Sequence, residues 1–234
     1  MTAKAILFDV FGTVVDWRGS LIGELTAFGA GRDIAGDWIA LVDRWRGNYV
    51  PSMDRVRRGT LPWTRLDDLH RATLDQLVGE LGISGLTEAD RAHLTRAWHR
   101  LHPWPDVVAG LERLKRRHII GTLSNGNVSL LTNLAKSARL PWDVVIGADL
   151  LHHYKPDPEV YRGACALLDL SPAEVMLVAA HNGDLRAARA EGLRTGFVPR
   201  PGEYGPHQHQ DMTAEAAWDV VATDFGDLAE QLGA

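Results

Sequence analysis

The chain has 234 residues, of which 45% are hydrophobic and 24% are charged, and its formal net charge is -5 at pH 7. This length accommodates one large domain or a core domain with a smaller insertion. The mild acidity gives no basic footprint for nucleic acid, and the single cysteine excludes an internal disulfide framework. Without a signal-peptide pattern or an apolar run of about 18 residues, we expect no membrane span and a cytoplasmic location.

Short apolar runs recur along the chain and are bounded by glycine or polar residues. The first occupies residues 4–8 and ends in Asp9, which Gly12 follows closely. The others occupy residues 119–124, 144–146, 175–180, 195–198 and 219–222. Runs of this kind are typical of buried strands in a parallel sheet.

The segment from residue 18 to residue 102 has a different pattern. Leucines at positions 66, 69, 77 and 81 follow helical spacing, and residues 37–50 and 87–101 also have helical patterns. No strand pattern occurs there. We therefore predict a helical insertion after the first strand, with the strand–helix alternation resuming at residue 103.

Helical patterns separate the later strands, at residues 106–117, 128–138 and 185–191, the last followed by Gly192. Strands that alternate with helices predict βαβ units and a parallel sheet. Ligands bind such sheets at the carboxyl ends of the strands, where this chain places Asp9, Ser124, Lys155 and the loop at residues 181–184.

Four loops at these ends carry distinctive sequences: DVFGT at residues 9–13, LSNG at residues 123–126, KPDP at residues 155–158 and VAAHNGD at residues 178–184. In order and spacing they resemble the four motifs of the haloacid dehalogenase superfamily. The resemblance implies a Rossmann-like α/β core formed by residues 1–17 and 103–234, with a helical cap domain at residues 18–102. Trp45-Arg46 further resembles a pair found in (S)-2-haloacid dehalogenases.

The resemblance implies that Asp9 is a covalent nucleophile. A carboxylate suits displacement at a saturated carbon, because water can afterwards hydrolyse the ester at its acyl carbon. Thr13 would hydrogen-bond Asp9, and Lys155 would keep it ionised. Asp184 would activate the water, although its position also suits the N-cap of a helix starting at Leu185.

The resemblance also implies a set of substrate-binding residues. Ser124 and Asn125 would donate hydrogen bonds to the substrate carboxylate and the halide. Arg46 would contact one of these anionic groups, with Arg44 close to it in the sequence. Tyr161 matches a tyrosine near the site, and core packing is an equally good interpretation.

Two positions separate the branches of the superfamily. Phosphatases carry a second aspartate where this chain has Phe11, and magnesium-dependent relatives carry an acidic residue where it has Ala180. Phe11 cannot protonate a leaving alcohol, and a halide needs no such acid. Magnesium prefers oxygen ligands, usually carboxylates. We therefore expect Phe11 to contact a haloacid substrate, and we expect neither a metal nor an organic cofactor.

His181 departs from the asparagine of common L-2-haloacid dehalogenases. It could donate to the halide, tighten the pocket or assist the water, and we hypothesise that it admits small substrates such as fluoroacetate.

The predicted activity is hydrolytic dehalogenation of haloacetates and L-2-halopropionates to 2-hydroxy acids through an aspartyl ester. The alternatives are a phosphatase of the same superfamily and a non-catalytic binding module on the same fold. The predicted partner is a small 2-haloacid rather than nucleic acid or membrane, and the resemblance implies a homodimer.

Overall fold

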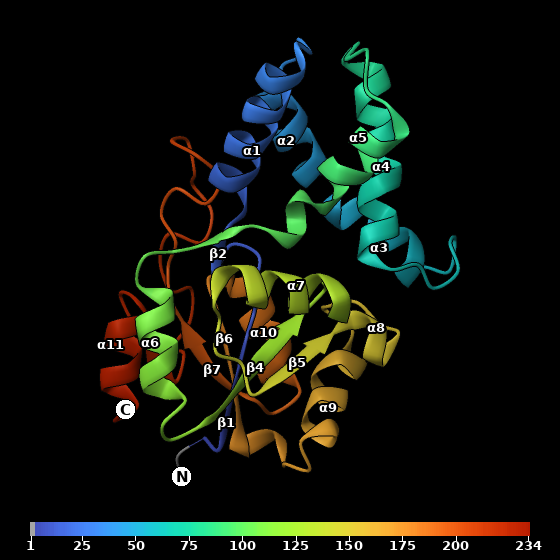
Figure 1. Cartoon of the computed structure of the whole chain (residues 1–234). Helices are drawn as coiled ribbons and strands as arrows, with labels where there is room; N and C mark the ends of the chain where they lie inside the picture. Colours follow the sequence, from blue (N-terminus) through green and yellow to red (C-terminus); the bar gives the residue numbers. More distant parts are fainter. Residues whose placement is uncertain (1–2) are drawn as a thin grey trace.

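A six-stranded parallel sheet forms the centre of the protein in the computed structural model, which describes residues 3–234 (Figure 1). In spatial order its strands are β5 (Val144–Gly147), β4 (Ile119–Ser124), β1 (Ala5–Phe8), β6 (Val175–Ala179), β7 (Arg194–Phe197) and β8 (Val220–Val221). Each lies in a run predicted as a strand, apart from shifts of one or two residues at the ends. The predicted α/β fold class is thus confirmed.

Helices cover both faces of the sheet because the side chains of each strand alternate between them. Ile6 and Phe8 of β1 belong to one hydrophobic cluster, and Ala5 and Leu7 belong to the other. The first cluster includes residues of α6 (Val107–Leu114), α7 (Val128–Ala138) and α11 (Phe225–Gln231). The second includes residues of α9 (Pro158–Leu167) and α10 (Asn182–Ala190). The remaining core helices are α8 (Ala148–Leu151) and the 3-10 helix η2 (Pro172–Glu174).

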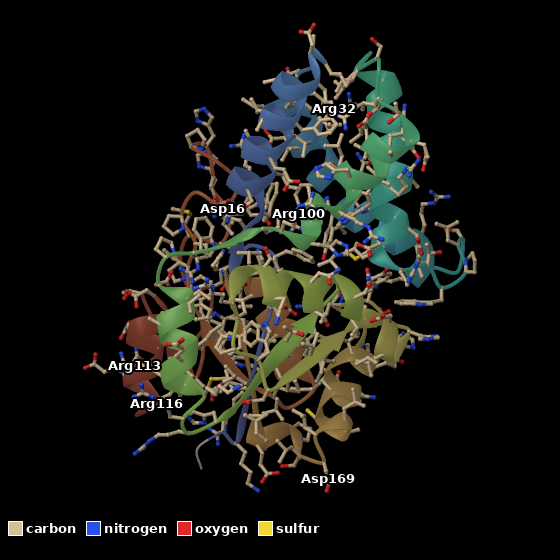
Figure 2. All side chains as sticks on the ribbon, viewed as in Figure 1. Asp16, Arg32, Arg100, Arg113, Arg116 and Asp169 are labelled. Atoms are coloured by element: carbon tan, nitrogen blue, oxygen red, sulfur yellow. The ribbon has the colours of Figure 1, made fainter. Side chains whose placement is uncertain are left out.

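A group of helices lies beyond the carboxyl ends of the strands, at the top of Figure 1. They are α1 (Trp17–Arg32), α2 (Trp38–Gly47), α3 (Tyr49–Arg57), α4 (Leu66–Glu80), α5 (Glu88–Thr95) and the 3-10 helix η1 (Arg96–His99). Two short antiparallel strands, β2 (Val15–Asp16) and β3 (His102–Pro103), stand where the chain enters and leaves this group. Side chains fill the space between these helices and the sheet (Figure 2).

Two helices predicted within the helical insertion are shorter than expected. The helix predicted at residues 37–50 ends at Gly47, and α3 starts after Asn48. Pro51 explains the interruption, since it has no N–H to continue the hydrogen-bond ladder but fits the first turn of a new helix. The helix predicted at residues 87–101 tightens into η1 after Thr95.

Helix α1 was not singled out from the sequence. It contains four glycines, at positions 19, 23, 29 and 31, which weaken the helical signal. The carboxylate of Asp16 caps its start by accepting the N–H of Gly19 at 2.8 Å. Among residues 3–234, no helix has the length and apolar character needed to cross a membrane.

Candidate active site

Asp9 lies directly after β1, between β4 and β6 in the sheet. Its backbone N–H donates to the carbonyl oxygen of Val178 at 3.0 Å, which extends the pairing with β6 by one residue. The loop that follows turns at Gly12, where φ is +90° and a Cβ atom would stand 2.1 Å from Oε1 of Glu203. Glycine is thus required there both by the backbone conformation and by the close approach of a carboxylate.

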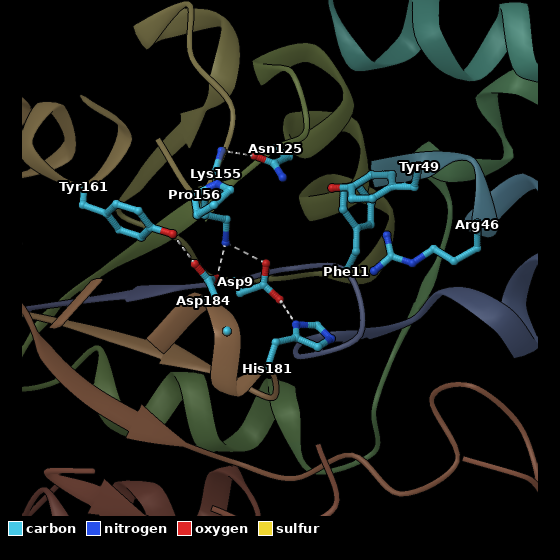
Figure 3. A pocket seen from close by; sticks show the side chains of 11 residues that line it. Asp9, Phe11, Arg46, Tyr49, Asn125, Lys155, Pro156, Tyr161, His181 and Asp184 are labelled. Atoms are coloured by element: carbon cyan, nitrogen blue, oxygen red, sulfur yellow. Dashed lines mark hydrogen bonds and ion pairs between the residues drawn. The ribbon is translucent and has the colours of Figure 1, made fainter. Parts of the chain in front are cut away.

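A pocket of about 260 Å³ opens over Asp9 (Figure 3). This volume suits a small molecule, since pockets for drug-sized ligands begin at roughly 300 Å³. The residues that line it are Asp9, Phe11, Arg46, Tyr49, Asn125, Lys155, Pro156, Tyr161, His181, Gly183 and Asp184. The pocket thus brings together eight of the ten residues predicted from the sequence for the site.

Three side chains donate hydrogen bonds to the Asp9 carboxylate. Lys155 Nζ lies 2.9 Å from Oδ1. Thr13 Oγ1 lies 2.8 Å from Oδ2, and His181 Nδ1 lies 3.1 Å from the same oxygen. Thr13 is itself fixed by the backbone N–H of Ala180, which donates to its hydroxyl at 2.8 Å. Thr13 is fully buried, so it lies behind the Asp9 carboxylate and not in the pocket wall.

Asp184 lies on the Oδ1 side of Asp9. One of its oxygens accepts a hydrogen bond from Lys155, and the other accepts the hydroxyl of Tyr161 at 2.7 Å. The alternative interpretation of Asp184 as an N-cap is wrong, because α10 starts earlier, at Asn182, and has His181 at its N-cap. Tyr161 fulfils both of its predicted interpretations: its ring packs in the core and its hydroxyl reaches the site.

His181 lies on the Oδ2 side, between two carboxylates. Its Nδ1 faces Asp9, and its Nε2 lies 2.9 Å from Oε2 of Glu203. Glu203 is almost fully buried, and its Oε1 accepts the indole N–H of Trp17 at 3.0 Å. The loop after β7 therefore supplies a carboxylate directly behind His181.

Helices α2 and α3 contribute Arg46 and Tyr49 to the pocket. The guanidinium carbon of Arg46 lies 4.2 Å from the ring centre of Tyr49 and 5.2 Å from that of Trp17. Nη1 of Arg46 is buried and has no hydrogen-bond partner among the described residues. Arg44, the neighbouring candidate, instead pairs with Glu80 at the surface. Phe11 adds an apolar wall, with its ring edge-on to that of Trp98.

Ser124 and Asn125 occupy different places. Asn125 lines the pocket, and its Oδ1 accepts the backbone N–H of Lys155 at 2.8 Å. This bond leaves the Nδ2 end of its amide to donate to a ligand. Ser124 is buried and is not among the lining residues; its Oγ accepts the N–H of Gly126 at 3.2 Å. Ser124 thus shapes the loop, and its predicted contact with a substrate remains a prediction.

The electrostatics of the site keep Asp9, Lys155 and His181 ionised. Burial alone would raise the pKa of Asp9, but Lys155 and His181 outweigh it and hold that pKa far below its usual range. Burial alone would lower the pKa of Lys155, yet the carboxylates of Asp184 and Asp9 raise it. His181 behaves in the same way, since Glu203 and Asp9 outweigh its burial and raise its pKa well above the ordinary value. The anionic carboxylate of Asp9 therefore lies between two cations.

Several site residues were missed by sequence reasoning. Tyr49 and Pro156 line the pocket, and Glu203 contacts His181. Tyr49 lies three positions after Arg46, on the same side of a helical pattern, so its position was a usable signal. Pro156 belongs to a motif that was recognised only for its lysine. Glu203 had no signal, because it lies in a loop rich in proline and glycine.

Among residues 3–234, no three His, Cys, Asp or Glu side chains are grouped in a way that could hold a metal ion. The groups that donate hydrogen bonds to the Asp9 carboxylate are an amine, a hydroxyl and an imidazole. This arrangement can present an ionised carboxylate to an electrophile in a small, partly apolar pocket.

Residues 3–192 match the haloacid dehalogenase-like hydrolases, and the chain belongs to this family. The (S)-2-haloacid dehalogenase 4A of Burkholderia cepacia is 30% identical over 94% of this chain and 95% of its own length. Crystal structures of two L-2-haloacid dehalogenases are similar throughout. PA0810 is 55% identical and covers 99% of both chains, with a TM-score of 0.97. The defluorinating Rha0230 is 50% identical over 99% of this chain and 96% of its own, also with a TM-score of 0.97. The resemblance predicted from the motifs is confirmed.

Proposed function

We propose that this chain is a hydrolase that removes the halogen from short 2-haloalkanoic acids and yields 2-hydroxy acids. The observation that carries this proposal is the ionised carboxylate of Asp9, which lies in a small pocket between a buried lysine and the apolar ring of Phe11. The names of the similar enzymes agree with this class of reaction.

In the first step, Oδ1 of Asp9 attacks the carbon that bears the halogen, and the halide leaves. Oδ1 has one hydrogen-bond partner, Lys155, whereas Oδ2 has two, Thr13 and His181. Each carboxylate oxygen has two lone pairs, so Oδ1 keeps one for the attack. Because the attack displaces the halide from the opposite side, it inverts the configuration of the carbon.

In the second step, water attacks the acyl carbon of the resulting Asp9 ester. Asp184 is the base that orients this water, and its carboxylate is held in place by Lys155 and Tyr161. Hydrolysis at the acyl carbon releases the 2-hydroxy acid and restores the Asp9 carboxylate.

Two donors are available for the anionic parts of the substrate. Nη1 of Arg46 has no partner among residues 3–234, and Nδ2 of Asn125 is the donor end of an amide whose oxygen is fixed by Lys155. A buried guanidinium nitrogen without a partner is costly, and a substrate carboxylate or a departing halide would satisfy it. Phe11 contacts the apolar carbon chain, and its place beside the nucleophile leaves no acid for a leaving alcohol.

We extend the proposal to the organisation of the chain. Residues 18–102 form a cap domain, and residues 1–17 and 103–234 form the core, with β2 and β3 at the junction. Arg46 and Tyr49 come from the cap, so the pocket requires both parts. The protein is further expected to be a homodimer, by resemblance to its family, and light scattering that gives the monomer mass at all concentrations would contradict this.

Small substrates, including fluoroacetate, form part of the proposal. The pocket is compact, and a similar enzyme is named as defluorinating. Fluoride is a poor leaving group, and a cationic imidazole beside the nucleophile supports its departure. Fluoride release from fluoroacetate that persists in His181→Ala would contradict a role of His181 in that departure.

The experiment that tests the function is halide release from chloroacetate, L-2-chloropropionate, D-2-chloropropionate and fluoroacetate. Release by the wild-type protein should be unaffected by EDTA, absent from Asp9→Asn and faster with the L isomer. Magnesium-dependent cleavage of a phosphate ester without any halide release would instead favour a phosphatase. Ligand binding without turnover, unchanged in Asp9→Asn, would favour a binding module.

A further inference from the structure

Glu203 is a buried carboxylate that the proposed mechanism does not use. Its side chain is only 1% exposed, and it contacts three donors: the indole N–H of Trp17, Nε2 of His181 and, at 3.9 Å, Nη2 of Arg46. A charge so deeply buried is costly unless it is paired. Its place next to Gly12, where a Cβ atom would not fit, ties it to the loop that carries Asp9.

His181 faces a carboxylate at each of its ring nitrogens. Nδ1 lies 3.1 Å from Asp9 Oδ2, and Nε2 lies 2.9 Å from Glu203 Oε2. An ionised carboxylate only accepts hydrogen bonds, so both nitrogens must donate, which only the imidazolium can do. Asp9 and Glu203 are the carboxylates that face the ring, and Lys155 and Arg46 lie on the far sides of them.

Once Oδ1 of Asp9 carries the substrate, Oδ2 becomes the carbonyl oxygen of the ester. Negative charge develops on this oxygen when water attacks the acyl carbon. Thr13 Oγ1 at 2.8 Å and His181 Nδ1 at 3.1 Å already donate to it. Donors that are fixed in advance where charge develops are the usual way in which enzymes stabilise such an intermediate.

We propose that Glu203 is a positioning residue that holds His181 as an imidazolium, and that His181 and Thr13 together form the oxyanion site for hydrolysis of the Asp9 ester. This inference rests on the proposed function and adds two side chains to its second step. It also gives His181 a role that differs from contact with the halide.

Water forms a bond to Cγ of Asp9, the electron pair of the Cγ–Oδ2 double bond moves to Oδ2, and Asp184 takes one proton from the water. The double bond then forms again, the Cγ–Oδ1 bond breaks, and Asp184 returns the proton to the departing alkoxide oxygen. The new carboxylic acid of Asp9 releases the remaining proton to solvent. The products are the 2-hydroxy acid and the ionised nucleophile.

The charges of the site support the same assignment. Three carboxylates, those of Asp9, Asp184 and Glu203, contact three cations, those of Lys155, Arg46 and His181. A neutral His181 would leave this cluster with a net negative charge, which would repel a substrate that is itself a carboxylate. The imidazolium thus serves substrate binding as well as ester hydrolysis.

Glu203→Gln is the variant that tests the inference, since it removes the charge and keeps the shape. Without Glu203, the pKa of His181 should fall toward its ordinary value of about 6.5, so the imidazolium is lost as pH rises. At pH 8.5 we expect ester hydrolysis at least about tenfold slower than in the wild type. Halide should then appear in a burst of one equivalent per enzyme, and intact mass spectrometry should detect the ester on Asp9.

Spectroscopy provides a readout that is independent of activity. In protein with 15N-labelled histidine, both ring nitrogens of His181 should be protonated at pH 8 in the wild type and not in Glu203→Gln. The resonances that disappear in His181→Asn identify this ring among the ten histidines. Glu215→Gln, which alters an exposed pair with Arg186, is the matched control and should behave as the wild type.

The two proposals fail in different ways. If the wild-type protein releases no halide from any haloacid, the proposed function fails. If it releases halide, but Glu203→Gln accumulates no ester and keeps His181 doubly protonated, the role of Glu203 is wrong. In the His181→Asn background, Glu203→Gln should slow ester hydrolysis only slightly. If Glu203→Gln slows ester hydrolysis equally in the wild-type and His181→Asn backgrounds, Glu203 acts without His181.

Discussion

The two oxygens of the Asp9 carboxylate face different surroundings. On the Oδ1 side stand Lys155, Asp184 and Tyr161, which are joined by direct hydrogen bonds. On the Oδ2 side stand Thr13 and His181, with Glu203 behind. The first side keeps a lone pair free and supplies a base for water, whereas the second side has its lone pairs occupied by donors. In the proposed mechanism, Oδ1 is the oxygen that attacks the substrate and Oδ2 is the oxygen that later carries the negative charge.

The largest effect is expected from breaking the Oδ1 side. Lys155→Met removes the cation shared by Asp9 and Asp184 and leaves two buried carboxylates close together. The repulsion raises the pKa of one of them, so the ionised nucleophile and the ionised base no longer coexist. We expect kcat/KM for halide release to fall about a thousandfold.

Lys136→Met is the matched control for this change, because Lys136 lies exposed on α7. It should release halide at the wild-type rate. Near wild-type activity in Lys155→Met would contradict the account of the Oδ1 side.

A smaller effect is expected from removing a neutral donor on the Oδ2 side. Thr13→Val keeps the shape but loses the bond to Asp9 and leaves the backbone N–H of Ala180 without its acceptor. Stability should fall by about 1–3 kcal/mol in urea unfolding, and kcat should fall about tenfold. Thr13→Ser keeps the hydroxyl and should retain most of the stability and most of kcat. If Thr13→Ser and Thr13→Val lose these equally, the hydrogen bonds of the hydroxyl are not the cause.

The smallest effect is expected on the pH dependence of the free energy of unfolding. The pKa of Asp9 is lower in the folded protein than in the unfolded chain, where it is about 3.9. Its ionisation therefore stabilises the fold above that pH, and this contribution is lost as pH falls toward the folded-state pKa. The stability advantage of the wild type over Asp9→Asn should shrink by about 1 kcal/mol or more between pH 6 and pH 3.

Urea unfolding at several pH values measures this difference. Asp33→Asn, at an exposed position, should follow the wild type at every pH. If the free energies of unfolding of the wild type and Asp9→Asn differ by the same amount at every pH, Asp9 is not held ionised by its neighbours.

The two sides of Asp9 also differ in how well they could be predicted. Asp9 and Lys155 lie in loops and Asp184 lies in the first turn of α10, at the edge where the strands of a parallel sheet end. Their proximity was therefore predictable. Glu203 lies in a loop whose prolines and glycines set the turns but not the direction of any side chain. Only the folded chain brings it behind His181.

The fold shows the same division. The strands of the sheet were predictable because buried runs leave a strong local pattern. The helices of the cap were less so: α1 contains four glycines, and the pattern at residues 37–50 continues through the break at Asn48. Ser124 fitted a motif, yet its hydroxyl accepts a bond from its own loop. A motif predicts where a residue lies in the fold, whereas tertiary packing determines which groups its side chain contacts.

In the proposed mechanism, Asp9 is esterified and the ester is then hydrolysed at the acyl carbon of Asp9. A single turnover of L-2-chloropropionate in water labelled with 18O, with enzyme in excess, tests it most directly. We expect the label to enter the Asp9 carboxylate, as found by mass spectrometry of the peptide that contains it, and the lactate formed to be unlabelled. Labelled lactate with unlabelled Asp9 would mean that water attacks the substrate directly and that Asp9 forms no ester.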